Sequence, residues 1–259
     1  ICTMGPCRIT KKAPRGICGC DVHGIVGRNY LKFTAGGASA HSDHGREICH
    51  TLYETAADGC YKVKDPEKLI RIAKEWGMET EGKDIYELAH EVALEGLMEY
   101  GKPFGTQRFL KRAPESQQKL WEENELAPYA IDREVSRSLH MTHMGCSSKP
   151  EALVKQAIRC GLGDGWGGSM MGTEFSDILF GTPKPIETEA NLGVMVEENV
   201  NIVVHGHDPS LSEMICEVAD SPEMIAYAKE QGAKGITISG VCCTSNEVAM
   251  RRGIPMAGN

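Results

Sequence analysis

Three cysteines near the start of the sequence, Cys2, Cys7 and Cys18, lie in turns rich in glycine and proline. Such turns allow backbone N–H groups to point at sulfur, which stabilises the negative charge of a thiolate-bound iron–sulfur cluster. A zinc site would use the same soft ligands, but zinc sites usually contain closely spaced pairs of cysteines. The spacing therefore favours an iron–sulfur cluster, with a fourth thiolate from Cys20 or from a cysteine that precedes Ile1.

Three histidines in the stretch AHSDHGREICH, namely His41, His44 and His50, follow one another in steps of three that are interrupted at Glu47. On a helix these residues would spiral gently along one side, and histidine side chains titrate near neutral pH, so the series is suited to relaying protons. The alternative is that they are ordinary capping or surface histidines. The residues alone favour that simpler interpretation.

A second thiol motif, GVCCTSNE, contains the adjacent Cys242 and Cys243 after an apolar run. The pair could form a strained disulfide or belong to the core. A helix N-terminus stabilises a thiolate, however, which favours one of the two facing a metal. The motif HGHDP follows an earlier apolar run and makes His205 or His207 a further candidate metal ligand.

The composition indicates the state of the cysteines and excludes some classes of binding partner. Eleven cysteines, an odd number without a secretory pattern, predict reduced thiols, and the isolated Cys60, Cys160 and Cys216 are expected to be small buried residues. A net charge of −8 argues against binding to nucleic acid or anionic membranes, and no apolar run is long enough to span a bilayer. We therefore expect a soluble, cytoplasmic protein. Because the chain begins at Ile1 without a methionine, we also expect sequence upstream.

The first part of the sequence is predicted to be helical. Residues 22 to 57 contain few helix breakers other than glycine, and Asp84 begins a capping box. Asp132 is expected to open another helix, and Pro150 to occupy the first turn of a third. Each glycine of TAGGASA, residues 34 to 40, would cost about 1 kcal/mol in a helix relative to alanine. Close backbone packing against a neighbouring helix or a cofactor would explain them.

The hydrophobic pattern changes after Pro183 and Pro185, which end the helical periodicity. We predict an α + α/β fold, with a helical, cluster-bearing domain over residues 1–186. The start of a Rossmann-like parallel α/β domain is predicted over residues 187–259.

The second part has a strand-helix-strand-helix order, with strands expected at residues 200–204 and 236–239 and a capping box at Thr244. The loops after parallel strands emerge at the same edge of a sheet, where ligand sites usually lie. His207 and Cys243 are therefore expected to converge on one site.

Eight motifs, in order along the chain, together resemble those of the anaerobic nickel–iron carbon monoxide dehydrogenases, including the subunit that partners acetyl-CoA synthase. The resemblance covers essentially the whole chain, from Cys2 to Pro255. The motifs are CTMGPCRI, RGICGCD, AHSDHGR, DGWGGSM, DILFGTPKP, NLGV, VHGHDP and GVCCTSNEVAMRRGIP.

The resemblance implies a homodimer with a helical N-terminal domain and Rossmann-like domains. The implied reaction is the reversible oxidation of CO with water to CO2. The resemblance implies a nickel–iron–sulfur catalytic cluster, and [4Fe-4S] clusters that pass electrons to a ferredoxin-type acceptor. It also implies that an acetyl-CoA synthase subunit is a candidate partner.

The resemblance also assigns site residues by motif position. The three N-terminal cysteines match three of the four ligands of an electron-relay cluster. His207 matches the histidine ligand of the catalytic cluster, Cys243 matches a cysteine ligand, and Cys242 is its close neighbour. His41 matches the acid–base histidine beside the substrate, and the other two histidines of that motif match the proton path behind it.

Some features depart from the family pattern or leave alternatives open. Glu47 stands where many relatives have a histidine, and the remaining cluster cysteines and a catalytic lysine are expected outside residues 1–259. One alternative is a hybrid-cluster protein that reduces hydroxylamine, although AHSDHGR and HGHDP fit the dehydrogenases better. The other is a non-catalytic iron–sulfur electron-transfer scaffold.

Overall fold

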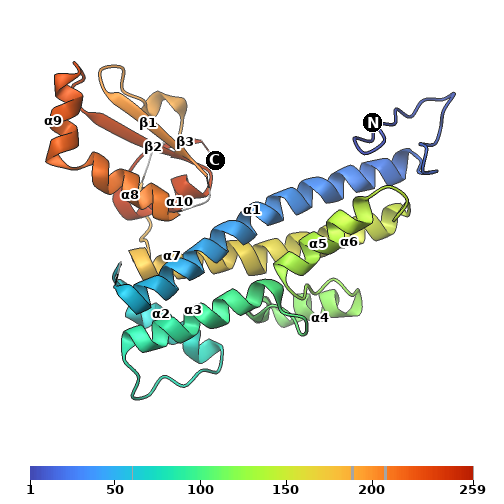
Figure 1. The fold of residues 1–259 in the computed structure, drawn as a ribbon, viewed down its shortest axis with the longest axis horizontal. Coiled ribbons are helices and arrows are strands. Elements are labelled where there is room, and N and C mark those ends of the chain that lie inside the picture. The colour runs from blue at the N-terminus through green and yellow to red at the C-terminus, as the bar shows by residue number, and fades with distance from the viewer. Residues whose placement is uncertain (60, 188–189, 207–208, 259) are drawn as a thin grey trace. The chain divides into compact units, whose positions relative to one another are not determined.

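A computed structural model describes residues 1–259 with the exception of 60, 188–189, 207–208 and 259. The chain divides into two compact units, which we call the helical unit and the mixed unit. The helical unit comprises Ile1–Arg46 and Ala93–Gly172, and the mixed unit comprises Glu47–Val92 and Thr173–Asn259. Helices α1 (Val22–Asp58), α3 (Ile85–Gly101) and α7 (Met170–Phe180) contribute to both (Figure 1).

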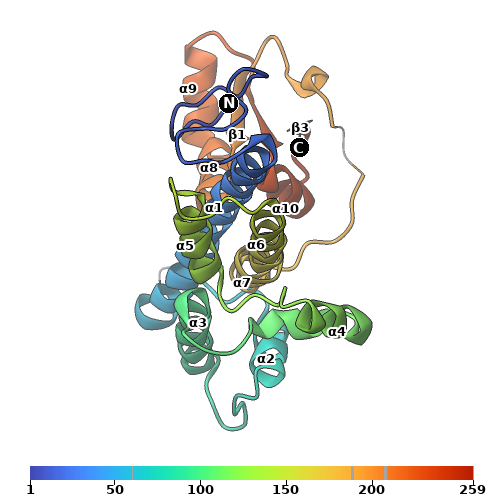
Figure 2. The ribbon, with the colours of Figure 1, turned by 90° about the vertical axis from the view of Figure 1, so that its right-hand side faces the viewer.

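The helical unit begins with an irregular segment of about twenty residues that precedes α1. Helices α1, α5 and α6 lie side by side in both Figure 1 and Figure 2. They are joined by the buried side chains of Leu31, Leu153 and Ala157, against which Met141 packs. The other elements are η1 (Arg108–Arg112), α4 (Glu115–Glu123), α5 (Ile131–Thr142), α6 (Pro150–Gly163) and the π-helical turn η2 (Asp164–Ser169).

Close backbone packing on α1 occurs away from the stretch where the sequence predicted it. A Cβ atom built at Gly36 or Gly37 of TAGGASA would meet no described atom within 4 Å, so no described helix packs closely there, and packing against a cofactor stays a prediction. At Gly45, by contrast, a Cβ would lie 2.8 Å from the carbonyl oxygen of Gly168 and would also clash with the hydroxyl of Tyr100. The backbone of α1 therefore approaches the π-helical turn closely, one turn beyond His41.

The mixed unit contains a parallel sheet with strand order β1-β2-β3. In register, Val200 pairs with Ile236 and His205 with Val241, so strands β1 and β2 end level with one another. Val204, Cys216, Ile238 and others form the core between the sheet and its helices. The elements are α2 (Pro66–Glu75), η3 (Leu192–Val194), β1 (Val200–His205), α8 (Pro209–Ala219), α9 (Pro222–Glu230), β2 (Ile236–Val241), α10 (Cys243–Arg252) and β3 (Met256–Gly258).

These elements confirm the predicted α + α/β fold, because helices occupy the chain up to Phe180 and the parallel strands begin at Val200. The domain boundary near Glu187 stays a prediction. Two helix starts differ from the predictions: α5 begins at Ile131, one residue before Asp132, and α10 begins at Cys243, so Thr244 lies within the helix instead of capping it.

A buried ion network holds the helices of the mixed unit together. Arg251 of α10, whose side chain is 5% exposed, donates to Asp177 of α7 over 2.9 Å. Asp177 also pairs with Lys68 of α2, and Arg251 lies 3.7 Å from Glu213 of α8. Since an unpaired charge is costly to bury, each member depends on the others.

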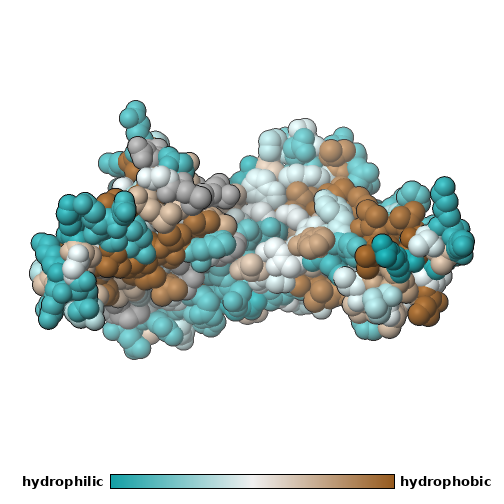
Figure 3. All heavy atoms as spheres, turned by 90° about the horizontal axis from the view of Figure 1, so that it is seen from above, coloured by the Kyte–Doolittle hydropathy of each residue, from teal (hydrophilic) through white to brown (hydrophobic). Residues whose placement is uncertain are grey.

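Apolar side chains remain uncovered on the α/β part of the mixed unit, where hydrophobic residues gather in Figure 3. They line a hollow of about 350 Å³ formed by Ile202, Met214, Ile215, Val218, Ala219, Met224 and Ile236. In the described part of the chain, no helix has the length and apolar character needed to cross a membrane.

Two of the three cysteines that were predicted to be small buried residues are buried. Cys160 and Cys216 are 0% and 2% exposed, and burial raises the pKa of each thiol to about 11. Both are therefore inert core residues at neutral pH. Cys60 lies outside the described residues.

Candidate functional site

The irregular N-terminal segment brings three predicted ligands onto one pocket. Cys2, Cys7 and Cys18 all line it. Reciprocal backbone hydrogen bonds between Cys2 and Cys7, of 2.8 and 3.0 Å, close the first turn and fix the separation of these two residues. Among the described residues, no group of three His, Cys, Asp or Glu side chains converges on a single point as the ligands of one metal ion would. The three thiols surround a pocket instead.

Two glycines make room for the Cys7 sulfur. A Cβ at Gly5 would clash with the Cys7 sulfur, and one at Gly16 would lie 3.3 Å from it. The two glycines thus let the Cys7 sulfur lie against the backbone at the edge of a pocket lined by three thiols, an arrangement suited to binding an iron–sulfur cluster. The residues present thus suit the group that the sequence predicted.

The fourth nearby cysteine, Cys20, does not line this pocket. It is 1% exposed, and its sulfur lies where a Cβ at Gly24 would be. Burial raises the pKa of the Cys20 thiol, whereas the backbone N–H of Cys20 and the Arg28 guanidinium lower the pKa of Cys18. Cys18 is thus the thiol whose surroundings favour the thiolate form that a metal needs.

A histidine–carboxylate pair lies elsewhere in the helical unit. His41 Nδ1 lies 2.7 Å from Asp164 Oδ1, and both side chains are about a quarter exposed. Asp164 is the first residue of the π-helical turn, a rare distortion that is frequent at functional sites. Asp164 was not among the residues predicted from the sequence, although the glycine-rich motif DGWGGSM that contains it was a signal of irregular backbone.

The three histidines of α1 differ in burial. His44 is 6% exposed and its ring lies 3.0 Å from the position that a Cβ on Gly172 would take. Glu47 and His50 are exposed. Along α1 the series therefore runs from the half-buried His41 to the exposed His50. The role of these histidines in proton transfer stays a prediction.

At the ends of the parallel strands, His205 of β1 lies beside Cys242, which follows β2. The distance from His205 Nε2 to the Cys242 sulfur is 3.1 Å. Cys243 is the first residue of α10. His207, the histidine that the sequence analysis preferred as a ligand, lies outside the described residues.

Cys242 has a strained backbone, with φ of 64° and ψ of −145°. Non-glycine residues rarely adopt this conformation, which costs about 1–3 kcal/mol and tends to cluster at active sites and ligand clamps. The strain sits at the sharp turn from strand to helix. It therefore favours a functional role for this turn on an observation that is independent of the thiols.

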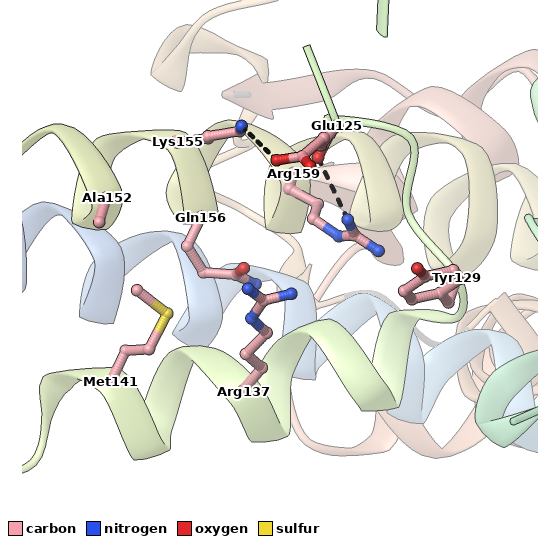
Figure 4. Close-up of a pocket in the computed structure, with 8 residues that line it drawn as sticks. All are labelled: Glu125, Tyr129, Arg137, Met141, Ala152, Lys155, Gln156 and Arg159. Carbon is pink, nitrogen blue, oxygen red and sulfur yellow. Dashed lines mark hydrogen bonds and ion pairs between the residues drawn. The ribbon is translucent and has the colours of Figure 1, made fainter. Parts of the chain in front are cut away.

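A separate pocket of about 300 Å³ lies between α5, α6 and the segment that precedes α5 (Figure 4). Two of its three cations are paired: Arg159 bonds Glu134 and Lys155 bonds Glu125, each over 2.8 Å. We therefore regard it as a structural ion cluster. Its lining residues are Glu125, Tyr129, Arg137, Met141, Ala152, Lys155, Gln156 and Arg159.

Comparison with known proteins gives a consistent result. The profile of the Prismane/CO dehydrogenase family matches residues 1–259. The chain is 45% identical to carbon monoxide dehydrogenase 1 of Methanosarcina mazei, over all of this chain and 42% of the relative. It is 41% identical to the carbon monoxide dehydrogenase/acetyl-CoA synthase subunit beta of Moorella thermoacetica, over 99% of this chain and 39% of the relative.

Solved structures give the same result. A nickel-free carbon monoxide dehydrogenase from Thermococcus sp. AM4 is 49% identical and superposes with a TM-score of 0.90, covering 99% of this chain and 42% of that one. The sequence thus spans about two fifths of the length of the relatives that it matches.

Proposed function

The chain belongs to the Prismane/CO dehydrogenase family, and we propose that it is part of an anaerobic carbon monoxide dehydrogenase. The reaction would be the reversible oxidation of CO with water to CO2. The observation that carries the proposal is the 45% identity, over the whole chain, to a protein named for this activity. The enzyme would act in the cytoplasm, where thiols stay reduced.

In this proposal the N-terminal pocket holds a [4Fe-4S] cluster through Cys2, Cys7 and Cys18. When bound, the cluster would accept and pass on single electrons toward a ferredoxin-type acceptor. The support is the shared pocket, the two glycines that make room for the Cys7 sulfur and the lowered pKa of the Cys18 thiol.

The turn at the end of the strands would hold part of the nickel–iron–sulfur catalytic cluster, which supplies the site where CO and water react. Cys243 and His207 are the proposed ligands. Cys242 would set the turn, held by its contact with His205. The strained backbone at this turn supports the assignment, because a conformation of this cost persists only where the surrounding structure imposes it.

His41 would take up a proton released in the reaction. A neutral histidine that donates its Nδ1 hydrogen to Asp164 has its lone pair on Nε2, so the 2.7 Å contact prepares Nε2 as the base. The carboxylate would then stabilise the imidazolium that forms. His44 and His50 would carry the proton onward, with Glu47 as a carboxylate in the same series.

The family also suggests an assembly. The enzyme would be a homodimer, and the likeness to the Moorella thermoacetica subunit supports an acetyl-CoA synthase subunit as a further partner. The alternatives of a hydroxylamine-reducing hybrid-cluster protein and of a non-catalytic electron-transfer scaffold are less well supported. The relatives at 41–45% identity reported above are named carbon monoxide dehydrogenases.

The test is metal analysis and activity of the full-length protein purified without oxygen. We expect nickel together with a large excess of iron, and reduction of a viologen dye that depends on CO. Iron without nickel, combined with hydroxylamine reduction, would instead establish the hybrid-cluster alternative. Iron without nickel and without either activity would establish the scaffold.

A further inference from the structure

A fully buried arginine lies against the N-terminal thiols. Arg28, in the second turn of α1, is 1% exposed and lines the same pocket as Cys2, Cys7 and Cys18. Its Nη1 donates to the Cys18 sulfur over 3.3 Å. Its Nε donates to the carbonyl oxygen of Ser147 over 2.7 Å, and its Nη2 bonds the same oxygen. The guanidinium is therefore held at both of its edges.

The neighbours of Arg28 distinguish it from the other buried arginines. Arg159 and Arg251 bond carboxylates, namely Glu134 and Asp177. In the described part of the chain, no Asp or Glu forms an ion pair with Arg28, which instead bonds the Cys18 sulfur and the backbone carbonyl oxygen of Ser147. A buried cation needs a compensating anion, so the pocket is built for negative charge on its sulfurs.

We propose that Arg28 is a positioning residue that raises the reduction potential of the cluster held by Cys2, Cys7 and Cys18. The proposal rests on the presence of that cluster. Reduction adds one electron, and therefore one negative charge, without making or breaking a bond. A cation that donates a hydrogen bond to a ligand sulfur stabilises the more negative, reduced state, and hydrogen bonds to the sulfurs and net charge are established determinants of such potentials.

The geometry also explains why arginine is required. The planar guanidinium can bond the Ser147 carbonyl through two nitrogens while a third reaches Cys18. A lysine has a single ammonium on a flexible stem, so it keeps the charge but does not hold this double contact. The residue fixes the Cys18 ligand and the charge beside it together.

The experiment is a redox titration of the relay-cluster signal, followed by electron paramagnetic resonance, in the anaerobic full-length enzyme. We expect Arg28→Met to lower the equilibrium constant for reduction about tenfold, which is about 59 mV for a one-electron couple. Arg28→Lys should give a smaller shift in the same direction. Arg8→Met is the matched control: it removes an exposed positive charge next to Cys7, and solvent should screen its loss.

The outcomes separate this proposal from the one it rests on. Absence of the relay-cluster signal from the unmodified enzyme would refute the cluster itself. A full signal at an unchanged potential in Arg28→Met, or an equal shift in Arg8→Met, would overturn the role of Arg28 alone. If Arg28→Met does not retain iron, Arg28→Lys decides: a lowered potential supports the proposal, and loss of the cluster from a normally folded Lys variant overturns it.

Discussion

The two thiol-bearing regions achieve their geometry in different ways. In the N-terminal pocket, side chains and loop contacts place the sulfurs: Arg28 reaches Cys18 from a helix, and two glycines make room for the Cys7 sulfur. At the strand ends, backbone geometry places the thiols, because the register of β1 and β2 pairs His205 with Val241, the residue before Cys242. The first region should therefore respond mainly to changes of side chain, and the second to changes of backbone freedom.

The His41–Asp164 pair belongs with the first kind of region. Its two members lie on α1 and on the π-helical turn, and a side-chain contact joins them across the helical unit. The pair is formed by a side-chain contact between distant residues, whereas the turn at Cys242 is formed by an unusual local backbone conformation.

The largest effect should follow from removing one sulfur from the N-terminal pocket. In Cys7→Ser we expect loss of the relay-cluster signal and of about four iron atoms per chain, because a hydroxyl is a poor ligand for iron–sulfur clusters. Iron analysis and absorption spectra of the anaerobic protein measure this. Cys146→Ser, at an exposed cysteine that does not line the pocket, should leave both unchanged. An unaltered cluster in Cys7→Ser would show that the thiols are core residues or bind another metal.

The next largest effect should come from the acid–base residue. We expect His41→Ala to reduce CO oxidation by about 10² or more while nickel and iron content stay intact, the usual scale for a positioned proton-transfer group. Rates across a range of pH, with and without the substitution, measure it. His140→Ala, at an exposed histidine of α5, should have no effect. Full activity of metal-replete His41→Ala at every pH would return the α1 histidines to the role of surface residues.

A smaller effect is expected from the partner of His41. Asp164→Asn keeps the shape of the side chain but replaces the carboxylate, so it should stabilise the imidazolium less and shift the acidic limb of the pH profile toward lower pH. We expect about a tenfold loss of rate, since Asp164 acts only through His41. In a His41→Ala background the same change should cost nothing further. An equal loss in both backgrounds would show that Asp164 matters for folding of the π-helical turn instead.

Hydrophobic periodicity and the positions of proline and glycine predicted most of the fold, because the pattern of each helix or strand lies within a short stretch of sequence. Pro150 does open α6, and the run at Val200 is β1. The site was harder, since its contacts join residues far apart in the chain. Arg28 meets Ser147, and His41 meets Asp164, 123 positions later. Nothing in a local pattern distinguishes such an arginine from a surface residue. Asp132 was expected only to open a helix, but its carboxylate also bonds Ser42 and Arg46.

The smallest effect, and the sharpest contrast between the two regions, concerns the backbone at Cys242. Glycine adopts a φ of 64° without strain, whereas alanine does not, so Cys242→Gly should be more stable to unfolding than Cys242→Ala by about 1 kcal/mol. Both variants lose the sulfur and its contact with His205, and the comparison therefore isolates the backbone. At the exposed helical position Ala226, Ala226→Gly should instead destabilise by about 1 kcal/mol relative to the parent. Thermal unfolding midpoints of the full-length variants measure both differences. Equal midpoints for the two Cys242 variants would mean that the turn is not strained, and that side-chain contacts position the thiols there as they do in the N-terminal pocket.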